Sequence, residues 1–340
     1  MSAAAAMAHY RQQQRLARRT ANQVQRLWSR IDSGDITGSW QAIAPRLIAT
    51  VTAAQEAAAA EADAYVAAVI ASQGATSDPS GRIDPRGFAG LASDGRSLWS
   101  LLYQPVISWK AGLAAGLAPP EAASRALGDA LRIATTQVTD AGRTAVGASM
   151  AANRTIRGYI RIAAPPCCAR CAILAGTEYG WNAGFQRHPR CDCVHMPATL
   201  AARGRRGRGP LQPPPGTITD AKAYFNSLSR AEQDRIFTRA GAQAIRDGAD
   251  IASVVNARRG MYTAAAGSLR LPATREATTR RGLWFAREFR RLQDIGAIPR
   301  GASPRGYRLP GPRLMPEAIY QLASSRDDAI RLLRRYGYIT

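Results

Sequence analysis

The spacing of apolar residues predicts a mainly helical chain. Between Ser39 and Gln73, apolar side chains recur at steps of three and four residues, which places them on one face of an α-helix. Gly74 follows, and a glycine at this position favours the end of a helix. A second long helix is expected from Glu121, directly after two prolines. Its apolar face consists of Leu127, Leu131, Ala134, Val138 and Ala145.

The segments around these two helices carry weaker signals. Residues 9–30 are polar and basic, with a thin apolar stripe that fits an exposed helix or a partner-binding arm. Residues 75–96 are rich in turn-forming residues and predict a loop. The apolar stretch Leu98–Lys110 is expected to be broken at Pro105. Residues 157–162 alternate in the manner of a short strand.

In the last third of the chain, helical patterns return. Ser229 and Glu232 fit a capping box, in which each side chain satisfies a backbone N–H at the start of a helix. Pro316 suits the first position of one short helix, and Ser325 suits the N-cap of another. Between these signals, residues 260–315 hold a basic segment flanked by stretches rich in glycine and proline. We assign no regular element there.

One segment predicts a boundary between domains. Residues 202–216 read ARGRRGRGPLQPPPG, in which glycine and proline disrupt both helix and strand and the arginines repel one another. The plain interpretation is a flexible linker. The alternative is a loose contact with the phosphates of nucleic acid, for which the candidates are Arg203, Arg205, Arg206 and Arg208.

The patterns together divide the chain into five regions. The regions are a basic arm or helix at 1–38, a helical domain at 39–200 with a Cys/His module at 157–197, a linker at 201–217, a helical segment at 218–260, and a basic region at 261–340 that ends in helices. The fold class predicted from these regions is mainly α, with one small α+β module.

Charge suggests an acidic partner. The formal net charge is +22 at pH 7, which favours binding to nucleic acid. All but two of the 46 basic residues are arginine, however, and a GC-rich coding sequence produces the same bias without selection for binding. Both interpretations stay open. No apolar run approaches the ~18–20 residues of a membrane span, and arginines follow the N-terminal alanines, unlike a secretory signal. We therefore expect a reducing cytoplasm and no membrane partner.

All five cysteines lie in one window, CCARCAILAGTEYGWNAGFQRHPRCDC at residues 167–193. Disulfides are disfavoured, because the number is odd and the expected compartment is reducing. A thiol nucleophile would need a basic partner and an orienting group in a cramped site. Metal binding fits better, because Cys168 and Cys171 form a CxxC knuckle and Cys191 and Cys193 form a second pair.

Zinc is the metal that these donors favour, because it takes four thiolate or imidazole ligands in a tetrahedron. The natural set is Cys168, Cys171, Cys191 and Cys193. His188 is an alternative ligand, or a group that orients a thiolate. Cys167 is out of register with the knuckle. Four such ligands would close the site to a catalytic water, so a structural role is expected, and a reduced, metal-free cluster is the alternative. The arginines at 170, 187 and 190 are expected to offset the negative charge of the thiolates.

No catalytic constellation is found in the sequence. A histidine–metal nuclease needs a catalytic histidine beside a metal-binding carboxylate or asparagine, and His195 is followed by Met-Pro instead. A HExxH helix is missing, and the sequence around Ser149 lacks the closing glycine of a nucleophile elbow. We therefore predict no catalytic residue and no small-molecule substrate.

The spacing in the cysteine window resembles that of the phage Mu F-like head morphogenesis family. In that family a CxxC is followed by about four residues and a glycine, here Gly176, and then by an HPxCRC motif with a proline after it, here Pro197. This chain has Asp192 where the family usually has arginine. The similarity covers about residues 40–200, and residues 224–260 look like the downstream region of minor capsid proteins of actinobacterial phages.

The resemblance implies a minor capsid protein inside the virion, made in the host cytoplasm. Its expected partners are the portal protein, the major capsid protein or both, with double-stranded DNA, bound without base preference, as a further candidate. Two alternatives remain open. One is an enzyme of the head-gene cluster, either a capsid maturation protease or a nuclease, and the other is a host-encoded, zinc-linked nucleic-acid binder.

Overall fold

The computed structural model describes residues 2–184, 188, 191, 193–199, 215–266, 269–305, 307–309 and 311–339. Helices dominate this part of the chain, and two small antiparallel sheets accompany them. The prediction of a mainly α fold with a small α+β module is therefore confirmed. The four arginines proposed for phosphate contact, Arg203, Arg205, Arg206 and Arg208, lie outside the described residues.

The chain forms two compact units. The first comprises Met1–Pro165 and Ala175–Thr219, and the second comprises Pro166–Leu174 and Asp220–Thr340. Among the described residues, no helix is both long enough and apolar enough to cross a membrane.

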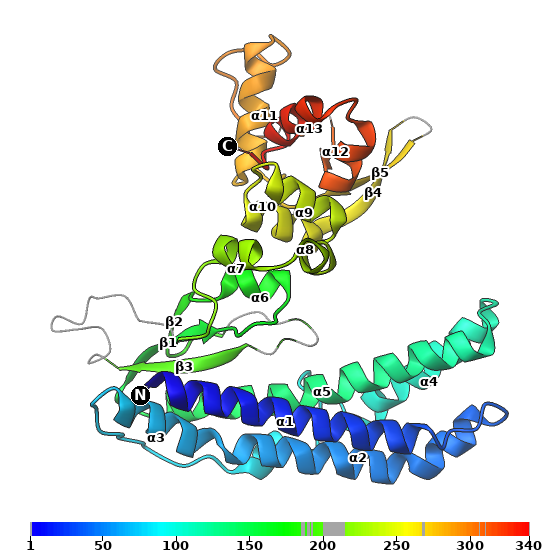
Figure 1. Ribbon diagram of the computed structural model, residues 1–340, viewed down its shortest axis with the longest axis vertical. Coiled ribbons are helices and arrows are strands. Elements are labelled where there is room, and N and C mark those ends of the chain that lie inside the picture. Colours follow the sequence, from blue (N-terminus) through cyan, green and yellow to red (C-terminus); the bar gives the residue numbers. More distant parts are fainter. Residues whose placement is uncertain are drawn as a thin grey trace. The chain divides into compact units, whose positions relative to one another are not determined.

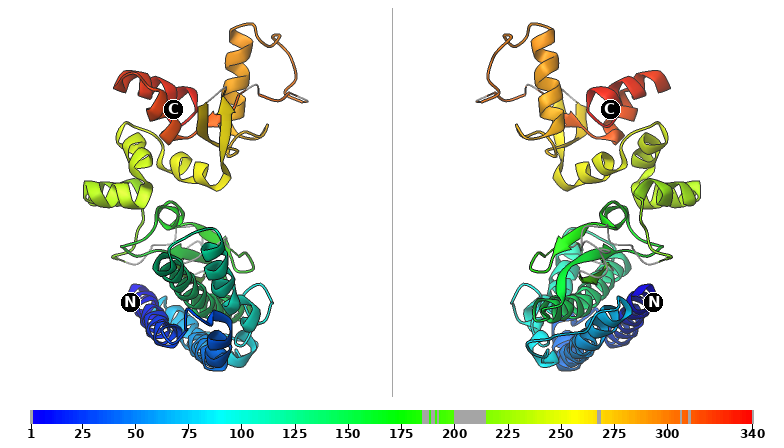
Figure 2. Two further views of the ribbon diagram at one scale, coloured as in Figure 1. Left: turned by 90° about the vertical axis from the view of Figure 1, so that its right-hand side faces the viewer. Right: turned by 90° about the vertical axis from the view of Figure 1, so that its left-hand side faces the viewer.

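The first unit is built mainly from long helices that pack side by side (Figures 1 and 2). These are α1 (Ser2–Trp28), α2 (Ile36–Ala60), α3 (Ala62–Ser72), α4 (Leu98–Ala114) and α5 (Pro119–Ala151), with a short 3-10 helix, η1 (Pro85–Phe88), between α3 and α4. Helix α5 contacts all of the other α-helices in this group. Their buried faces form one core, with Trp40, Leu47 and Leu102 almost fully enclosed.

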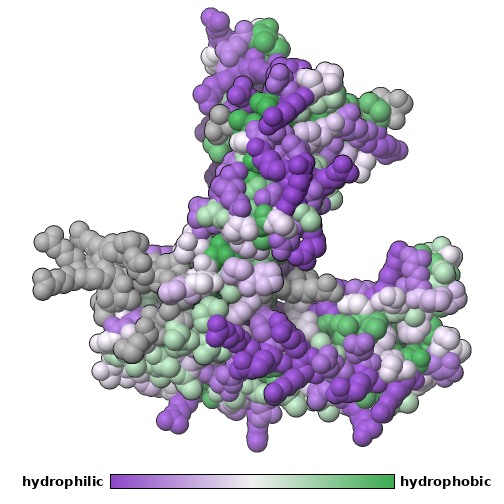
Figure 3. All heavy atoms as spheres, viewed as in Figure 1, coloured by the Kyte–Doolittle hydropathy of each residue, from purple (hydrophilic) through white to green (hydrophobic). Residues whose placement is uncertain are grey.

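Small residues allow these helices to approach closely. Ala58 on α2 is fully buried, and a Cβ placed on Gly142 of α5 would lie only 3.3 Å from its carbonyl oxygen. Close backbone packing at small residues therefore complements the large buried side chains of this core. The exposed residues of α1 are mostly arginine and glutamine, and they form part of the hydrophilic surface seen in Figure 3.

Two expectations for these helices need correction. The helix predicted over 39–73 is two helices, α2 and α3, which meet at Glu61. Helix α4 continues through Pro105, because the proline is buried in the core and its packing outweighs one missing hydrogen bond. Gly74 has a φ of +74° at the end of α3, as expected for a helix stop.

A three-stranded sheet completes the first unit. Its strands are β1 (Ile156–Ile162), β2 (Glu178–Gly180) and β3 (Val194–Thr199), in the order β2-β1-β3 with both pairs antiparallel. The strand predicted at 157–162 is therefore confirmed, as the centre of this sheet. A Cβ on Gly158 would lie 2.5 Å from the carbonyl oxygen of Tyr179, so β1 and β2 can pair only with glycine there.

The second unit consists of short elements. Its helices are α6 (Ala169–Leu174), α7 (Ala221–Ser227), α8 (Arg230–Phe237), α9 (Arg239–Arg246), α10 (Ile251–Ala257), η3 (Arg258–Gly260), α11 (Leu283–Asp294), α12 (Pro316–Leu322) and α13 (Arg326–Arg335). Its sheet has the order β4-β5-β6, from β4 (Met261–Ala266), β5 (Leu269–Thr274) and β6 (Arg313–Leu314).

Local signals explain where several of these helices begin. The capping box of Ser229 and Glu232 is present at the start of α8. Pro316 opens α12, and Ser325 caps α13 by accepting a hydrogen bond from the N–H of Asp328. These three predictions are confirmed. The hairpin of β4 and β5 and the helix α11 were not predicted, and they occupy part of the basic segment 260–315.

Candidate metal centre

The structure brings the predicted ligands together in two groups of three. The Sγ atoms of Cys171, Cys191 and Cys193 lie within 4.8 Å of one another, and so do the ligand atoms of Cys168, Cys171 and His188. Cys171 belongs to both groups. Thiols and an imidazole at this separation can hold a metal ion, and sulfur and nitrogen donors are those that zinc prefers.

The CxxC knuckle is held by a hydrogen bond within its own turn. The backbone N–H of Cys171 donates to Sγ of Cys168 at 3.3 Å, and α6 starts between the two residues at Ala169. The helical turn places positions three apart on the same side, so both thiols can face one ion. Cys171 is buried and Cys168 is exposed.

Arg143 fixes the backbone of the second thiol pair. This arginine lies on α5, is only 7% exposed, and donates from Nε to the carbonyl oxygen of Cys193 at 2.7 Å. Its Nη2 donates to the carbonyl oxygen of Cys191, and its Nη1 pairs with Asp140 at 3.1 Å. One guanidinium therefore sets the spacing of two candidate ligands, whose side chains are themselves almost fully buried.

Arg161 supplies positive charge to the same pair. It lies on β1, is 1% exposed, and directs Nη2 toward Sγ of Cys191 at 3.6 Å. A buried guanidinium at this distance favours the thiolate, the form that binds metal. The backbone of Arg161 also accepts a hydrogen bond from the N–H of Gly176, which has a φ of +79°. Gly176, the glycine of the motif, is therefore favoured at this position, because few other residues adopt a positive φ.

Of the three arginines expected to offset thiolate charge, Arg170 alone lies among the described residues. Arg187 and Arg190 lie outside the described residues, and Arg170 donates to Oδ1 of Asn256. Beside Cys191 the structure places Arg143 and Arg161, which were not proposed from the sequence. The sequence offers a signal for Arg161, which lies in the predicted strand, but none for Arg143, whose neighbours on the helix face include Thr139 and Asp140.

Cys167 belongs to neither ligand group, and its backbone is bound by a tyrosine. Its N–H donates to the hydroxyl of Tyr224, and that hydroxyl donates to the carbonyl oxygen of Cys167, both at 3.1 Å. Burial raises the pKa of the Tyr224 hydroxyl above its ordinary value. The phenol therefore stays protonated and can both donate and accept.

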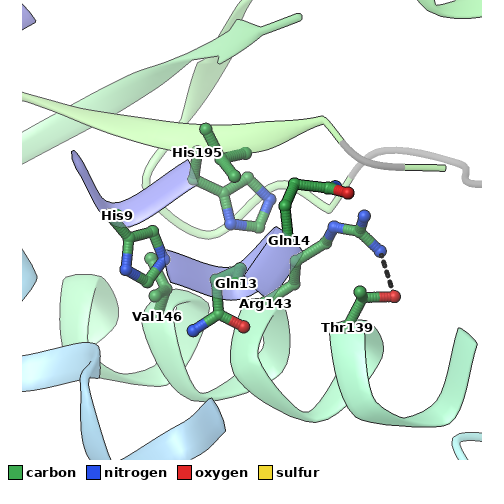
Figure 4. Close-up of a pocket in the computed structure, with 8 residues that line it drawn as sticks. His9, Gln13, Gln14, Thr139, Arg143, Val146 and His195 are labelled. Atoms are coloured by element: carbon green, nitrogen blue, oxygen red, sulfur yellow. Dashed lines mark hydrogen bonds between the residues drawn. The ribbon is translucent and has the colours of Figure 1, made fainter. Parts of the chain in front are cut away.

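A small pocket lies beside Arg143 and is lined by two histidines, His9 and His195 (Figure 4). His9 stacks on Tyr65 with ring centroids 3.9 Å apart, and burial lowers the pKa of this histidine to about 4. His195 packs edge-on against Tyr159. None of the described residues that line this pocket is acidic.

Comparison with family models, with curated proteins and with solved structures finds no match to this chain.

Proposed function

We propose that the chain is a non-enzymatic head morphogenesis protein of a tailed phage, stabilised by a structural zinc ion. The observation that carries the proposal is the gathering of the motif's thiols and histidine around Cys171. The motif resembles that of Mu F-like proteins, and its thiols and histidine lie close enough together to hold a metal ion. The partners that follow from this role are the portal protein or the major capsid protein, inside the capsid.

A structural rather than a catalytic role is supported by the surroundings of the thiols. Cys171, Cys191 and Cys193 are buried, and the charge and backbone contacts of Arg161 and Arg143 hold the second pair in place. Once a metal ion is bound by four such ligands, no position remains for a reactive water. Zinc bound in this way contributes directly to the free energy of folding.

Metal analysis of the purified chain tests the zinc proposal. We expect about one equivalent of zinc per chain, and a lower melting temperature after a chelator removes it. Less than about half an equivalent, together with a melting temperature that the chelator does not change, would contradict it.

The role in the head needs a separate experiment. Particles purified from a host that produces this chain should contain it in a few copies, and crosslinking should join it to the portal or major capsid protein. The chain should be missing from tails separated from the same particles. If it is missing from heads as well, while the purified chain still contains zinc, the head assignment fails and the metal site stands.

A further inference from the structure

The second unit contains a cavity of about 390 Å³ that is lined by arginines. The cavity lies among β4, the end of β5, the start of α11 and the segment that leads into β6. The arginines that line it are Arg275, Arg280, Arg308 and Arg313, and none of the described residues that line it is acidic. Eleven arginines and three acidic residues lie between positions 270 and 313, so the surrounding charge has the same sign.

Arg313 carries a buried charge without a carboxylate partner among the described residues. It is 2% exposed, and its three nitrogens donate to the backbone carbonyls of Tyr336, Glu276 and Gly337 at 2.9, 3.2 and 3.4 Å. Its guanidinium also lies 4.4 Å from the ring centre of Tyr338. These neutral groups orient the guanidinium. Burial lowers its pKa, and the negative charge of Glu276 opposes that lowering only in part. An anion in the cavity would compensate that charge.

The other three arginines stand at the rim of the cavity and are exposed. In the described part of the chain, Arg275, Arg280 and Arg308 form no ion pair. Arg275 lies against the ring of Tyr262, with its guanidinium carbon 5.3 Å from the ring centre. Three guanidinium groups are therefore available to bind phosphate oxygens, for which their forked geometry is suited.

Neutral donors at the cavity are also unused. The indole Nε1–H of Trp284 is buried and has no hydrogen-bond partner among the described residues. An unsatisfied buried donor of this kind is costly, and a ligand oxygen would satisfy it. Trp284 lies in the first turn of α11, which has no side-chain cap and no acidic residue in that turn. The helix therefore presents its positive end, and its first turn lines the cavity.

The hydroxyl groups and aromatic rings narrow the chemical class of the ligand. Thr274 and Thr278 already donate to backbone carbonyls, whereas the hydroxyl of Thr279 has no partner among the described residues. Tyr307 lines the cavity and is 39% exposed, so its ring offers a surface on which a base can stack. A volume of about 390 Å³ exceeds what a single phosphate fills and lies within the range of small-ligand sites.

We propose that this cavity binds one nucleotide unit, with its phosphate on the arginines and Trp284 and its base against Tyr307. The chemistry is the same for a free nucleotide and for a nucleotide within a strand. The site lies wholly within the second unit, and it depends neither on the metal centre nor on a role in the phage head.

Binding by the full chain should be measured with three probes, namely inorganic phosphate, a mononucleotide and a short single-stranded oligonucleotide. The test variant is Arg280→Ala with Arg308→Ala. The matched control is Arg300→Ala with Arg305→Ala, which removes the same charge from exposed positions that do not line the cavity. We expect the test variant to weaken binding at least about tenfold, and the control to weaken it far less.

The probes separate the two sources of the ligand. Mononucleotide binding that needs Arg280 and Arg308 indicates a free nucleotide, and binding of the oligonucleotide alone indicates a strand. Ligand binding should also change the fluorescence of Trp284, and this change should be lost in Trp284→Phe. The proposal is overturned if neither nucleotide probe binds, or if the test and control variants weaken binding equally. Binding of inorganic phosphate without discrimination in favour of a nucleotide also overturns it.

Discussion

Arg143 joins α5 to the segment that carries the second pair of candidate ligands by donating its Nε–H to the carbonyl oxygen of Cys193 at 2.7 Å. The two residues are 50 positions apart in the chain. The candidate ligands are thus positioned by a buried side chain of the helical core as well as by their own turn, and the stability of the core and the geometry of the site depend on each other.

We predict that Arg143→Met destabilises the fold by about 3–5 kcal/mol, because it leaves the buried carboxylate of Asp140 without its guanidinium partner. Helix α5 offers a matched control in Arg132→Met. Arg132 also pairs with an aspartate three positions earlier, but both side chains are about one-third exposed, so a loss of about 0.2–1 kcal/mol is expected. Urea denaturation measures the free energy of unfolding of both variants. Equal losses in the two would contradict the role of Arg143 as an anchor.

Cys171→Ser should abolish zinc binding, because Cys171 is the ligand shared by both groups. Cys167→Ser is the control, since Cys167 belongs to neither group and its backbone is held by Tyr224. Zinc content and melting temperature should fall in the first variant and stay at the wild-type values in the second. A loss of zinc in Cys167→Ser would mean that the ligand set has been assigned incorrectly.

The stability of the first unit should fall at acidic pH through His9. Burial lowers the pKa of His9 to about 4, whereas in the unfolded chain this histidine binds the proton near its ordinary pKa of 6.5. The contribution of neutral His9 is therefore complete above about pH 6.5 and is lost as the pH falls toward 4, by about 3 kcal/mol in total. Arg143 lines the same pocket, and its positive charge would also oppose protonation of His9.

His9→Phe tests this pH dependence while keeping an aromatic ring against Tyr65. Denaturation at pH 7.5, 6 and 5 should show a smaller loss of stability for the variant than for the wild type. Carboxylates titrate in both proteins, so the difference in stability loss between wild type and variant reports the contribution of His9. Parallel curves would show that His9 does not contribute.

Pro45→Ala should stabilise the chain. Pro45 lies inside α2 and is exposed, so the substitution restores a helical hydrogen bond without removing core packing, and the gain is bounded by the ~3 kcal/mol cost of proline in a helix. Pro105→Ala in α4 should gain less, because Pro105 is buried and the smaller side chain leaves a void. Thermal denaturation compares the two, and an equal or greater gain at Pro105 would contradict this reasoning.

Sequence periodicity predicted the long helices well, because their apolar faces repeat over many turns. It failed at Glu61, where the apolar pattern continues without interruption across a break between two helices. It also missed β3, whose buried residues do not alternate with exposed ones.

The site was predictable in part. The ligands could be proposed from their spacing, because sulfur and nitrogen donors have few other uses in such a pattern. Arg143 could not be assigned in the same way, because its contact with Cys193 exists only once α5 and the segment beside β3 are packed together. The hairpin of β4 and β5 was missed for a similar reason, since its pairing lies in a segment whose glycine and proline content suggests loops.

The four short helices α7 to α10 of the second unit each carry their own starting signal. The side chains of Asp220, Ser229, Thr238 and Asp250 each accept a hydrogen bond from a backbone N–H in the first turn of the helix that follows. These bonds span only three residues, so closing them costs little chain entropy. We therefore expect this stretch to become helical while the chain is still being synthesised, before Arg313 and Leu314 emerge to pair with β5. The order of folding in this unit would then follow the order of synthesis.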